Sequence, residues 1–182
     1  ASALIADADG DTPLTLARSP AAVRALLDAA PGSVDMRNGS GRTALIGAAA
    51  AGDGDLVCVL LEMGADVNLA DEIGGDTPLH WAAANGFEDV AHRLLDARAD
   101  ASQANADADA PLAMAAMGGH VGTISALIEV CGADAVSHAN LRGETALMLA
   151  LLHGRTDGAR ALLMADGIDV HTADLAGRTP LM

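Results

Sequence analysis

A three-residue motif recurs six times along the chain, and this repetition constrains the fold more than any other feature. The third residue of the motif is always Leu, and the first is Thr in five of the six copies. Successive copies are 31 to 35 residues apart. A regular period of this length indicates stacked copies of one small structural unit, because a single unit cannot bury its own apolar face. The copies are Thr12–Leu14, Thr43–Leu45, Thr77–Leu79, Ala110–Leu112, Thr145–Leu147 and Thr179–Leu181.

Each motif is predicted to begin a short inner helix. Thr caps helix N-termini, and Pro, the middle residue in four copies, is tolerated in the first turn. An Ala follows the motif Leu by three positions in the first five copies, which lets a neighbouring helix approach closely. A Gly usually precedes the Thr by two positions, within a hairpin-like turn. Ala108 takes that place in the fourth copy, so we expect this hairpin to depart from the pattern.

A second apolar block follows each of the first five motifs and predicts an outer helix. Its apolar residues recur at i, i+3 and i+4, which places them on one helical face. A turn containing Asp is expected after these helices, for example at Gly132–Ala135, with Gly suited to a left-handed cap. The blocks are Val23–Leu27, Val57–Leu61, Val90–Leu95, Ile124–Ile128 and Ala159–Leu163.

These motifs resemble the ankyrin repeat family over nearly the whole chain. The segment Gly75–Ala83, which reads GDTPLHWAA, is close to the family consensus. The resemblance implies one all-α domain over residues 1–182, an ankyrin-repeat solenoid of helix–turn–helix units with hairpin-like β-turn fingers. The predicted units one to five span 9–40, 41–73, 74–107, 108–141 and 142–175, and a partial sixth unit spans 176–182.

The two end units differ from the others. Arg18-Ser19-Pro20 interrupts the inner helix of the first unit, as is common in terminal repeats. The sixth motif is followed only by Met182, so either the natural chain continues or a stub of the sixth hairpin seals the fifth unit. The first residues, Ala1–Leu4, show no signal peptide.

Composition supports stacked helices and excludes several partners. Of 182 residues, 51% are hydrophobic but only 1% aromatic, so the core must consist of Ala, Leu, Val, Ile and Met. The net charge is −15, all ten basic residues are Arg, and no basic cluster exists, which disfavours nucleic acid and anionic membranes. No apolar run reaches the roughly 18 residues of a membrane span. Two cysteines without a CxxC motif favour a reducing compartment, the cytoplasm first and an organelle after leader removal as the alternative.

The sequence contains no complete catalytic or metal-binding motif, and we expect no catalytic residue, no metal and no cofactor. The runs Asp7-x-Asp9-x-Asp11 and Asn105-x-Asp107-x-Asp109 lack the Gly and the final acid of a calcium loop. None of the six histidines has another at i+4, and His80 matches the family position where imidazole bonds the neighbouring backbone. Cys58 lies in an apolar helix stripe, which favours a core residue over a nucleophile.

The resemblance implies that a protein partner binds the concave surface of fingers and inner helices. The residue two positions after the motif Leu is expected near this surface. The residue one helical turn later, five or six positions after the Leu, is expected there as well. Five of them could form an apolar stripe with the single Trp as a hot spot. The alternative is that the same residues pack between neighbouring units, as apolar residues at helical spacing usually do. The stripe consists of Trp81, Met114, Met117, Leu149 and Leu152.

The finger tips are the second candidate for partner contacts, because their residues vary between copies while the frame does not. Ile73 and Leu141 are apolar tips, and Arg142 is a charged one. The third and fifth units are expected to carry an extra residue near the finger, at Gly74-Gly75 and at Asn140–Arg142. Such insertions often fall on a binding face.

The sequence is consistent with three functions. The first is a non-enzymatic interaction scaffold whose protein partner carries a basic segment attracted by the acidic chain. The second is a structural or linker subunit held permanently in a large assembly, organellar in one version. The third is the repeat region of a larger enzyme or channel.

Overall fold

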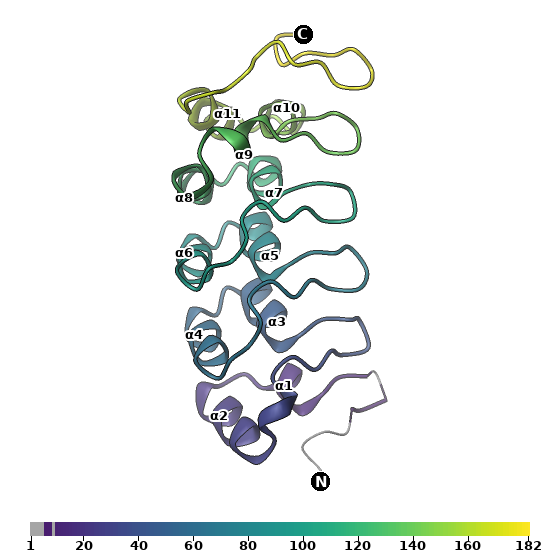
Figure 1. Cartoon of the computed structure of the whole chain (residues 1–182), viewed down its shortest axis with the longest axis vertical. Helices are drawn as coiled ribbons and strands as arrows, with labels where there is room; N and C mark the ends of the chain where they lie inside the picture. The colour runs from purple at the N-terminus through teal and green to yellow at the C-terminus, as the bar shows by residue number, and fades with distance from the viewer. Residues whose placement is uncertain (1–5, 9) are drawn as a thin grey trace.

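The computed structural model describes residues 6–8 and 10–182, and in it the units stack into two layers of helices with a row of fingers (Figure 1). Ala1–Leu4, and Asp9 where the first unit is predicted to begin, lie outside the described residues. The inner helices are α1 (Pro13–Leu16), α3 (Ala44–Ala51), α5 (Pro78–Asn85), α7 (Pro111–Gly118) and α10 (Ala146–Leu152). The outer helices are α2 (Pro20–Ala29), α4 (Gly54–Glu62), α6 (Glu88–Asp96), α8 (Val121–Cys131) and α11 (Thr156–Leu163).

The fingers project away from both helix layers along one side of the stack (Figure 1). Among the described residues the fingers contain no β-strand, and an isolated antiparallel bridge joins Ala139 to Thr145. The all-α prediction is therefore confirmed. We call the surface formed by the fingers and the exposed side of the inner helices the finger face.

The motif Thr begins the inner helices as expected. The Thr43 and Thr77 hydroxyls accept hydrogen bonds from the backbone N–H three residues later, and Thr12 and Thr145 do the same. Each such cap contributes about 1 kcal/mol to helix stability. Ala110 leaves α7 without a side-chain cap. In the first unit α1 has only four residues, because Ser19 and Pro20 begin α2 directly afterwards.

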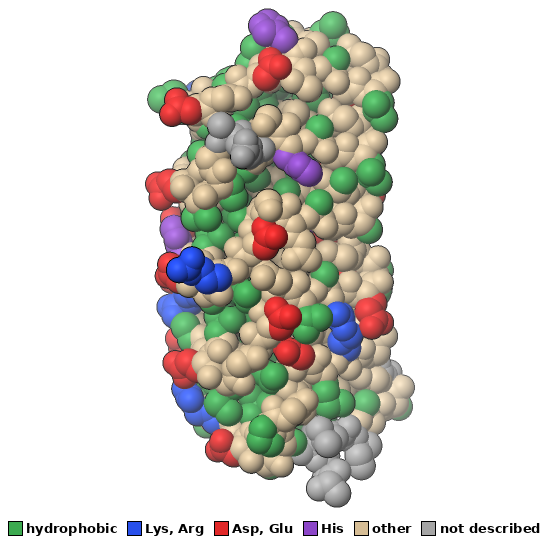
Figure 2. Space-filling view, in the orientation of Figure 1, with side chains coloured by type: hydrophobic (Ala, Val, Ile, Leu, Met, Phe, Trp, Pro, Cys, Tyr) green, Lys and Arg blue, Asp and Glu red, His purple; other side chains and the backbone are tan. Residues whose placement is uncertain are grey.

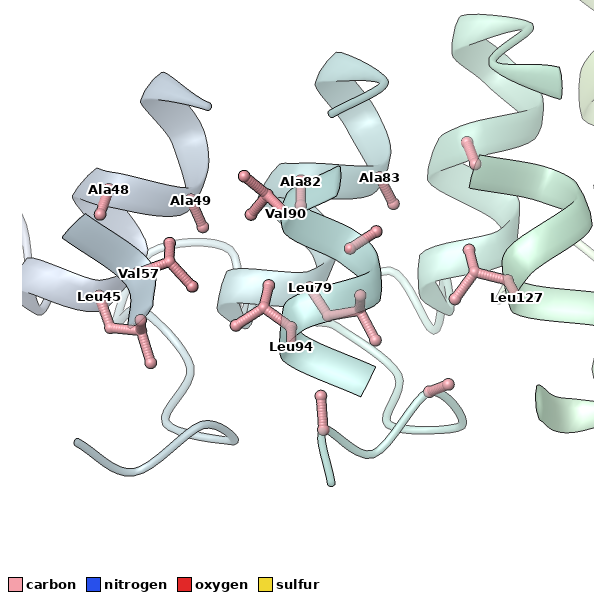
Figure 3. Close-up of a cluster of buried hydrophobic side chains, with 14 of the residues drawn as sticks. Leu45, Ala48, Ala49, Val57, Leu79, Ala82, Ala83, Val90, Leu94 and Leu127 are labelled. Atoms are coloured by element: carbon pink, nitrogen blue, oxygen red, sulfur yellow. The ribbon is translucent and has the colours of Figure 1, made fainter. Parts of the chain in front are cut away.

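The core runs through all units between the two layers. Figure 3 shows Leu45 and Leu79 on inner helices beside Val57 and Leu94 on outer helices, all fully shielded from solvent. Small residues such as Ala82 fill the crossings, so helices approach closely where larger side chains would separate them. Each unit buries apolar surface against its neighbours, and this makes the units stable only together.

The outer helix of the fourth unit ends differently from the prediction. Instead of the expected turn at Gly132–Ala135, the chain forms a further helix, α9 (Ala133–Ser137), directly after Gly132. Val136 of α9 is buried, so the added helix fits over the core. This insertion lengthens the interval between the fourth and fifth motifs to 35 residues.

The hairpin around Ala108 does not depart from the pattern, which corrects the expectation. Ala108 has φ +59°, in the same left-handed region as Gly41 (+72°) and Gly143 (+75°) at the equivalent position. The finger turn therefore imposes its backbone conformation on a residue that does not favour it.

Candidate functional site

A side-chain amide or carboxylate organises each finger turn. In the second finger, Asn38 Oδ1 accepts hydrogen bonds from the backbone N–H of Ser40 and Arg42, both at 3.0 Å. Asn105, Asn140 and Asp174 do the same in their own fingers. The turn is closed locally, so its tip residues are free to vary without loss of shape.

The same side chains join one finger to the next. Asn38 Nδ2 donates to Asp11 Oδ1 at 2.8 Å, and Asn105 Nδ2 donates to Asp76 Oδ1 at 2.8 Å. In each pair the acceptor is the acid immediately before the motif Thr of the preceding unit. Backbone bonds such as Ala106 N–H to the Gly74 carbonyl (2.9 Å) reinforce the ladder. The fingers therefore form one continuous wall.

Both members of this pair are exchanged between units two and three. Arg42 stands where copies one, three, four and five carry an acid, and Asp71 stands where the second, fourth and fifth fingers carry Asn. Arg42 Nε lies 3.8 Å from Asp71 Oδ2. Burial would raise the pKa of Asp71, but hydrogen bonds from the Gly74 and Asp76 N–H groups, from Trp81, and the Arg42 charge hold it below its ordinary value.

Trp81 lies in this cluster, half-buried on α5. Its indole Nε1 donates to Asp71 Oδ2 at 3.2 Å, and the Arg42 guanidinium carbon lies 4.0 Å from the ring centroid. Cation–π contacts of this kind orient the guanidinium as well as attracting it. Only part of the Trp81 side chain is therefore open to a partner.

The other predicted stripe residues divide into two groups. Met114 and Met117 on α7 are half-buried, and Leu152 at the end of α10 is 54% exposed. Leu149 is only 2% exposed and packs in the core, so its expected place on the surface is wrong. The stripe is interrupted in the fifth unit because α10 turns Leu149 inward and Leu152 outward.

The apolar and charged tips all reach solvent. Ile73 is 77% exposed, Leu141 is 66% exposed, and the Arg142 side chain is largely open while its Nε contacts Glu144 at 2.7 Å. The third finger has the expected extra residue, since its turn runs from Asp71 to Asp76. The fifth finger is of ordinary length, because the extra residues of that interval lie in the α9 region instead.

His80 is fully buried and structural. Its Nε2 donates to the Asp109 carbonyl of the next unit at 3.0 Å, and its Nδ1 accepts from the Thr77 N–H. Burial lowers its pKa below 6.5, although nearby carboxylates oppose the shift. The neutral imidazole thus connects two units through the backbone. His120 makes a comparable bond to the Ala84 carbonyl.

The thiols and acids show no clustered chemistry in the described part of the chain. No group of three or more His, Cys, Asp or Glu there could hold a metal ion. Cys58 receives a 2.7 Å contact from Arg93 Nη1, and burial raises the pKa of the Cys131 thiol. Neither cysteine forms a disulfide.

Surface charge is spread along the stack. Figure 2 shows acidic side chains scattered over the face in view, along the outer-helix side and also across the middle and toward the fingers, with apolar side chains between them. Across the described residues, no helix is both long and apolar enough to cross a membrane.

Sequence reasoning missed Arg42 and Asp71 as members of the site. The signal was present, since Arg replaces the acid of the second copy and Asp replaces the Asn of the third finger, the two positions that face each other. Comparing the copies position by position across the finger would have paired them, because opposite charges at facing positions attract.

The sequence of this chain is similar to one protein family and to several characterised proteins. The family described as "Ankyrin repeats (3 copies)" matches residues 1–71, 19–105 and 79–174. The chain is 40% identical over 79 residues to protein phosphatase 1 regulatory subunit 27 of Mus musculus, covering 43% of this chain and 51% of that protein. It is 42% identical over 101 residues to B-cell lymphoma 3 protein homolog of Mus musculus, covering 52% and 22%. It is 38% identical over 124 residues to putative palmitoyltransferase ZDHHC13 of Danio rerio, covering 68% and 19%.

The chain thus spans about half the length of the first relative and about a fifth of the other two. The family matches overlap and together cover most of the sequence. Ankyrin repeats are protein–protein interaction domains and are generally non-catalytic. By sequence and by fold, this chain belongs to the ankyrin repeat family.

Proposed function

We propose that this chain is a non-enzymatic scaffold that binds a partner protein along its finger face. The observation that carries the proposal is the continuous finger wall, which presents variable, solvent-exposed tips on a frame of hydrogen-bonded turns. Ile73 is the clearest example, since it is a large apolar residue with 77% exposure at the end of a rigid turn. An exposed apolar side chain on a fixed support binds a partner with little loss of entropy.

The residues proposed to contact the partner are chosen by the exposure of their side chains. The tips Ile73, Leu141 and Arg142 and the inner-helix residue Leu152 are open, and we propose them as direct contacts. Trp81, Met114 and Met117 are half-buried and would contribute the edges of their side chains. Leu149 supports α10 from behind.

The test is affinity capture with quantitative mass spectrometry. The double substitution Ile73→Ser and Leu152→Ser removes two exposed contacts at separate points of the finger face, so the fold should remain. If each contact contributes about 1.4 kcal/mol, partner recovery falls by about tenfold per residue. The matched control is Val130→Ser, which changes a 60% exposed residue on the outer helix α8. Equal losses in both proteins, or none in either, would refute binding through the finger face.

A second candidate is a subunit or repeat region within a larger assembly or enzyme. It is favoured by the exposed apolar residues of the fifth unit, of which Met164 is 83% and Leu175 is 82% exposed, and by the similarity to a fraction of a palmitoyltransferase. The native mass of the protein in cell extract decides between the two. A stable monomer that exchanges partners supports the scaffold, and a fixed large complex supports the assembly.

A further inference from the structure

The finger face is hollowed where units one and two meet. A groove of about 420 Å³ lies there, with Gly47 and Ala50 of α3 at its floor. Leu16 and Arg18 line it from the first unit, and Arg42 lines it from the second finger. Gly47 occupies the position that Trp81 occupies in the third unit. No atom lies within 4 Å of where a Cβ at residue 47 would stand, so the hollow is space that a side chain fills elsewhere.

Arg42 lines this groove, and its guanidinium is held in a fixed position. It rests on the Trp81 ring with 4.0 Å to the centroid, and Asp71 Oδ2 lies 3.8 Å from its Nε. Nε is buried without a hydrogen-bond partner, while 37% of the side chain stays accessible. The terminal Nη nitrogens are the polar atoms of this side chain that remain for a ligand. A planar guanidinium fork fixed in this way matches the two oxygens of a carboxylate.

Two arginines give the groove hydrogen-bond donors, beside the carboxylate of Asp11. Arg18 is exposed and forms no ion pair or hydrogen bond within the described residues. The acids beside the groove already have internal partners. Asp11 Oδ1 accepts from Asn38 at 2.8 Å, and Asp71 accepts from Trp81 and two backbone N–H groups. A ligand for this groove must therefore bring acceptors for two arginines.

We propose that this groove is an anchor site for a partner segment that carries an aliphatic side chain directly followed by Asp or Glu. The aliphatic side chain fills the space over Gly47 beside Leu16. The carboxylate receives the Nη groups of Arg42, with Arg18 as the second cation. This assignment rests on the proposed function, because it names the chemistry of one part of the same face.

The test uses two synthetic peptides that differ by one group, acetyl-Ala-Leu-Glu-Ala-amide and acetyl-Ala-Leu-Gln-Ala-amide. Binding is followed by NMR through the backbone N–H groups of α3 and the indole of Trp81, the single Trp of the chain. The Glu peptide should shift these resonances saturably and bind at least about tenfold more tightly than the Gln peptide, since a charge-assisted bidentate pair is lost.

Three variants locate the site. Arg42→Gln should abolish the preference for Glu over Gln. Gly47→Met should block both peptides by filling the hollow, without lowering the melting temperature, because Met favours a helix more than Gly does. Arg160→Gln removes the same charge from the exposed outer face of α11 and should leave peptide binding unchanged.

Two results would overturn the anchor site. One is the absence of saturable shifts with the Glu peptide at millimolar concentration, and the other is equal affinity for both peptides or unchanged binding to Gly47→Met. Failure here leaves the proposed function separately measurable. If Ile73→Ser and Leu152→Ser still lose captured partners, the finger face binds protein and only the anchor chemistry is wrong.

Discussion

At the scale of single residues, the fingers are specified by pairs of facing side chains. An acid before the motif Thr is paired with Asn in the next unit at Asp11, Asp76 and Asp109. Where Arg42 replaces the acid, Asp71 replaces the Asn. An amide donates to a carboxylate and a carboxylate pairs with a guanidinium, so this exchange keeps an attractive contact at the junction. A comparison of the repeat copies within this chain therefore indicates which finger positions are in contact.

His80 predicts a pH dependence of stability. Its pKa is lowered in the folded protein, whereas the unfolded chain has the ordinary value of 6.5. Between these two values the unfolded state binds more protons, so the free energy of unfolding falls as pH drops below 6.5. The slope contributed by one such group is at most about 1.4 kcal/mol per pH unit.

The measurement is urea unfolding across this range for the wild type and for His80→Gln. The variant is less stable at neutral pH, because its connection to the Asp109 carbonyl is altered, and it should lose this part of the slope. An identical pH slope in both proteins would show that His80 titrates normally in the fold.

At the scale of elements, the fourth unit shows how much local departure a stacked repeat tolerates. Ala108 stands in place of the turn Gly, and Ala110 stands in place of the capping Thr. The helix α7 still forms over Pro111–Gly118 and carries the usual buried Leu112. Packing against α5 and α10 on either side therefore replaces the missing local signals.

The strain at Ala108 can be relieved. Ala108→Gly should raise the free energy of unfolding by about 0.5–1 kcal/mol, because removing Cβ strain at φ +59° outweighs the added entropy of the unfolded chain. Ala106→Gly in the same turn is the matched control, since Ala106 does not have a positive φ, and this change should lower stability. Denaturant midpoints at equal m-values compare the two. No gain for Ala108→Gly would mean that the left-handed turn carries no strain.

At the scale of the whole molecule, shaped contacts are concentrated on the finger face, whereas negative charge is spread along the stack. The finger face offers shaped contacts, while many exposed acids lie on outer helices, among them Asp55 on α4, Glu88 and Asp96 on α6, and Asp157 on α11. With a net charge of −15, the protein should attract a basic partner segment from a distance, independently of the specific contacts.

This division predicts the salt dependence of association. For a captured partner with a basic segment, the association rate constant should fall several-fold as salt rises from about 0.1 M to about 1 M, while the Debye length falls from about 10 Å to about 3 Å. The dissociation rate constant should change less. Stopped-flow kinetics measure both, and a partner with its Lys and Arg replaced by Gln is the control. A salt-independent association rate would remove the electrostatic part of the proposal.

Much of the fold could be predicted from the sequence by itself. The period, the Thr caps, the buried Leu and Ala positions and the finger turns all follow from local chemistry that each copy repeats. Among the described residues, ten α-helices lie where the motif and the apolar blocks place them, and the additions are α9 and a 3₁₀ helix at Pro31–Ser33. These features are local, since a cap or a turn depends on residues a few positions apart.

Only the tertiary structure decided which apolar residues a partner can reach. Leu149 and Leu152 are both apolar and lie on one short helix, yet the first is 2% exposed and the second 54%. Likewise, the sequence shows Gly47 only as a residue of low helix propensity. The groove over it exists because Arg42 from a finger and Leu16 from another unit enclose it. An inner helix has neighbours on two sides, and periodicity cannot say how far each neighbour covers it, because exposure is set by residues distant in sequence.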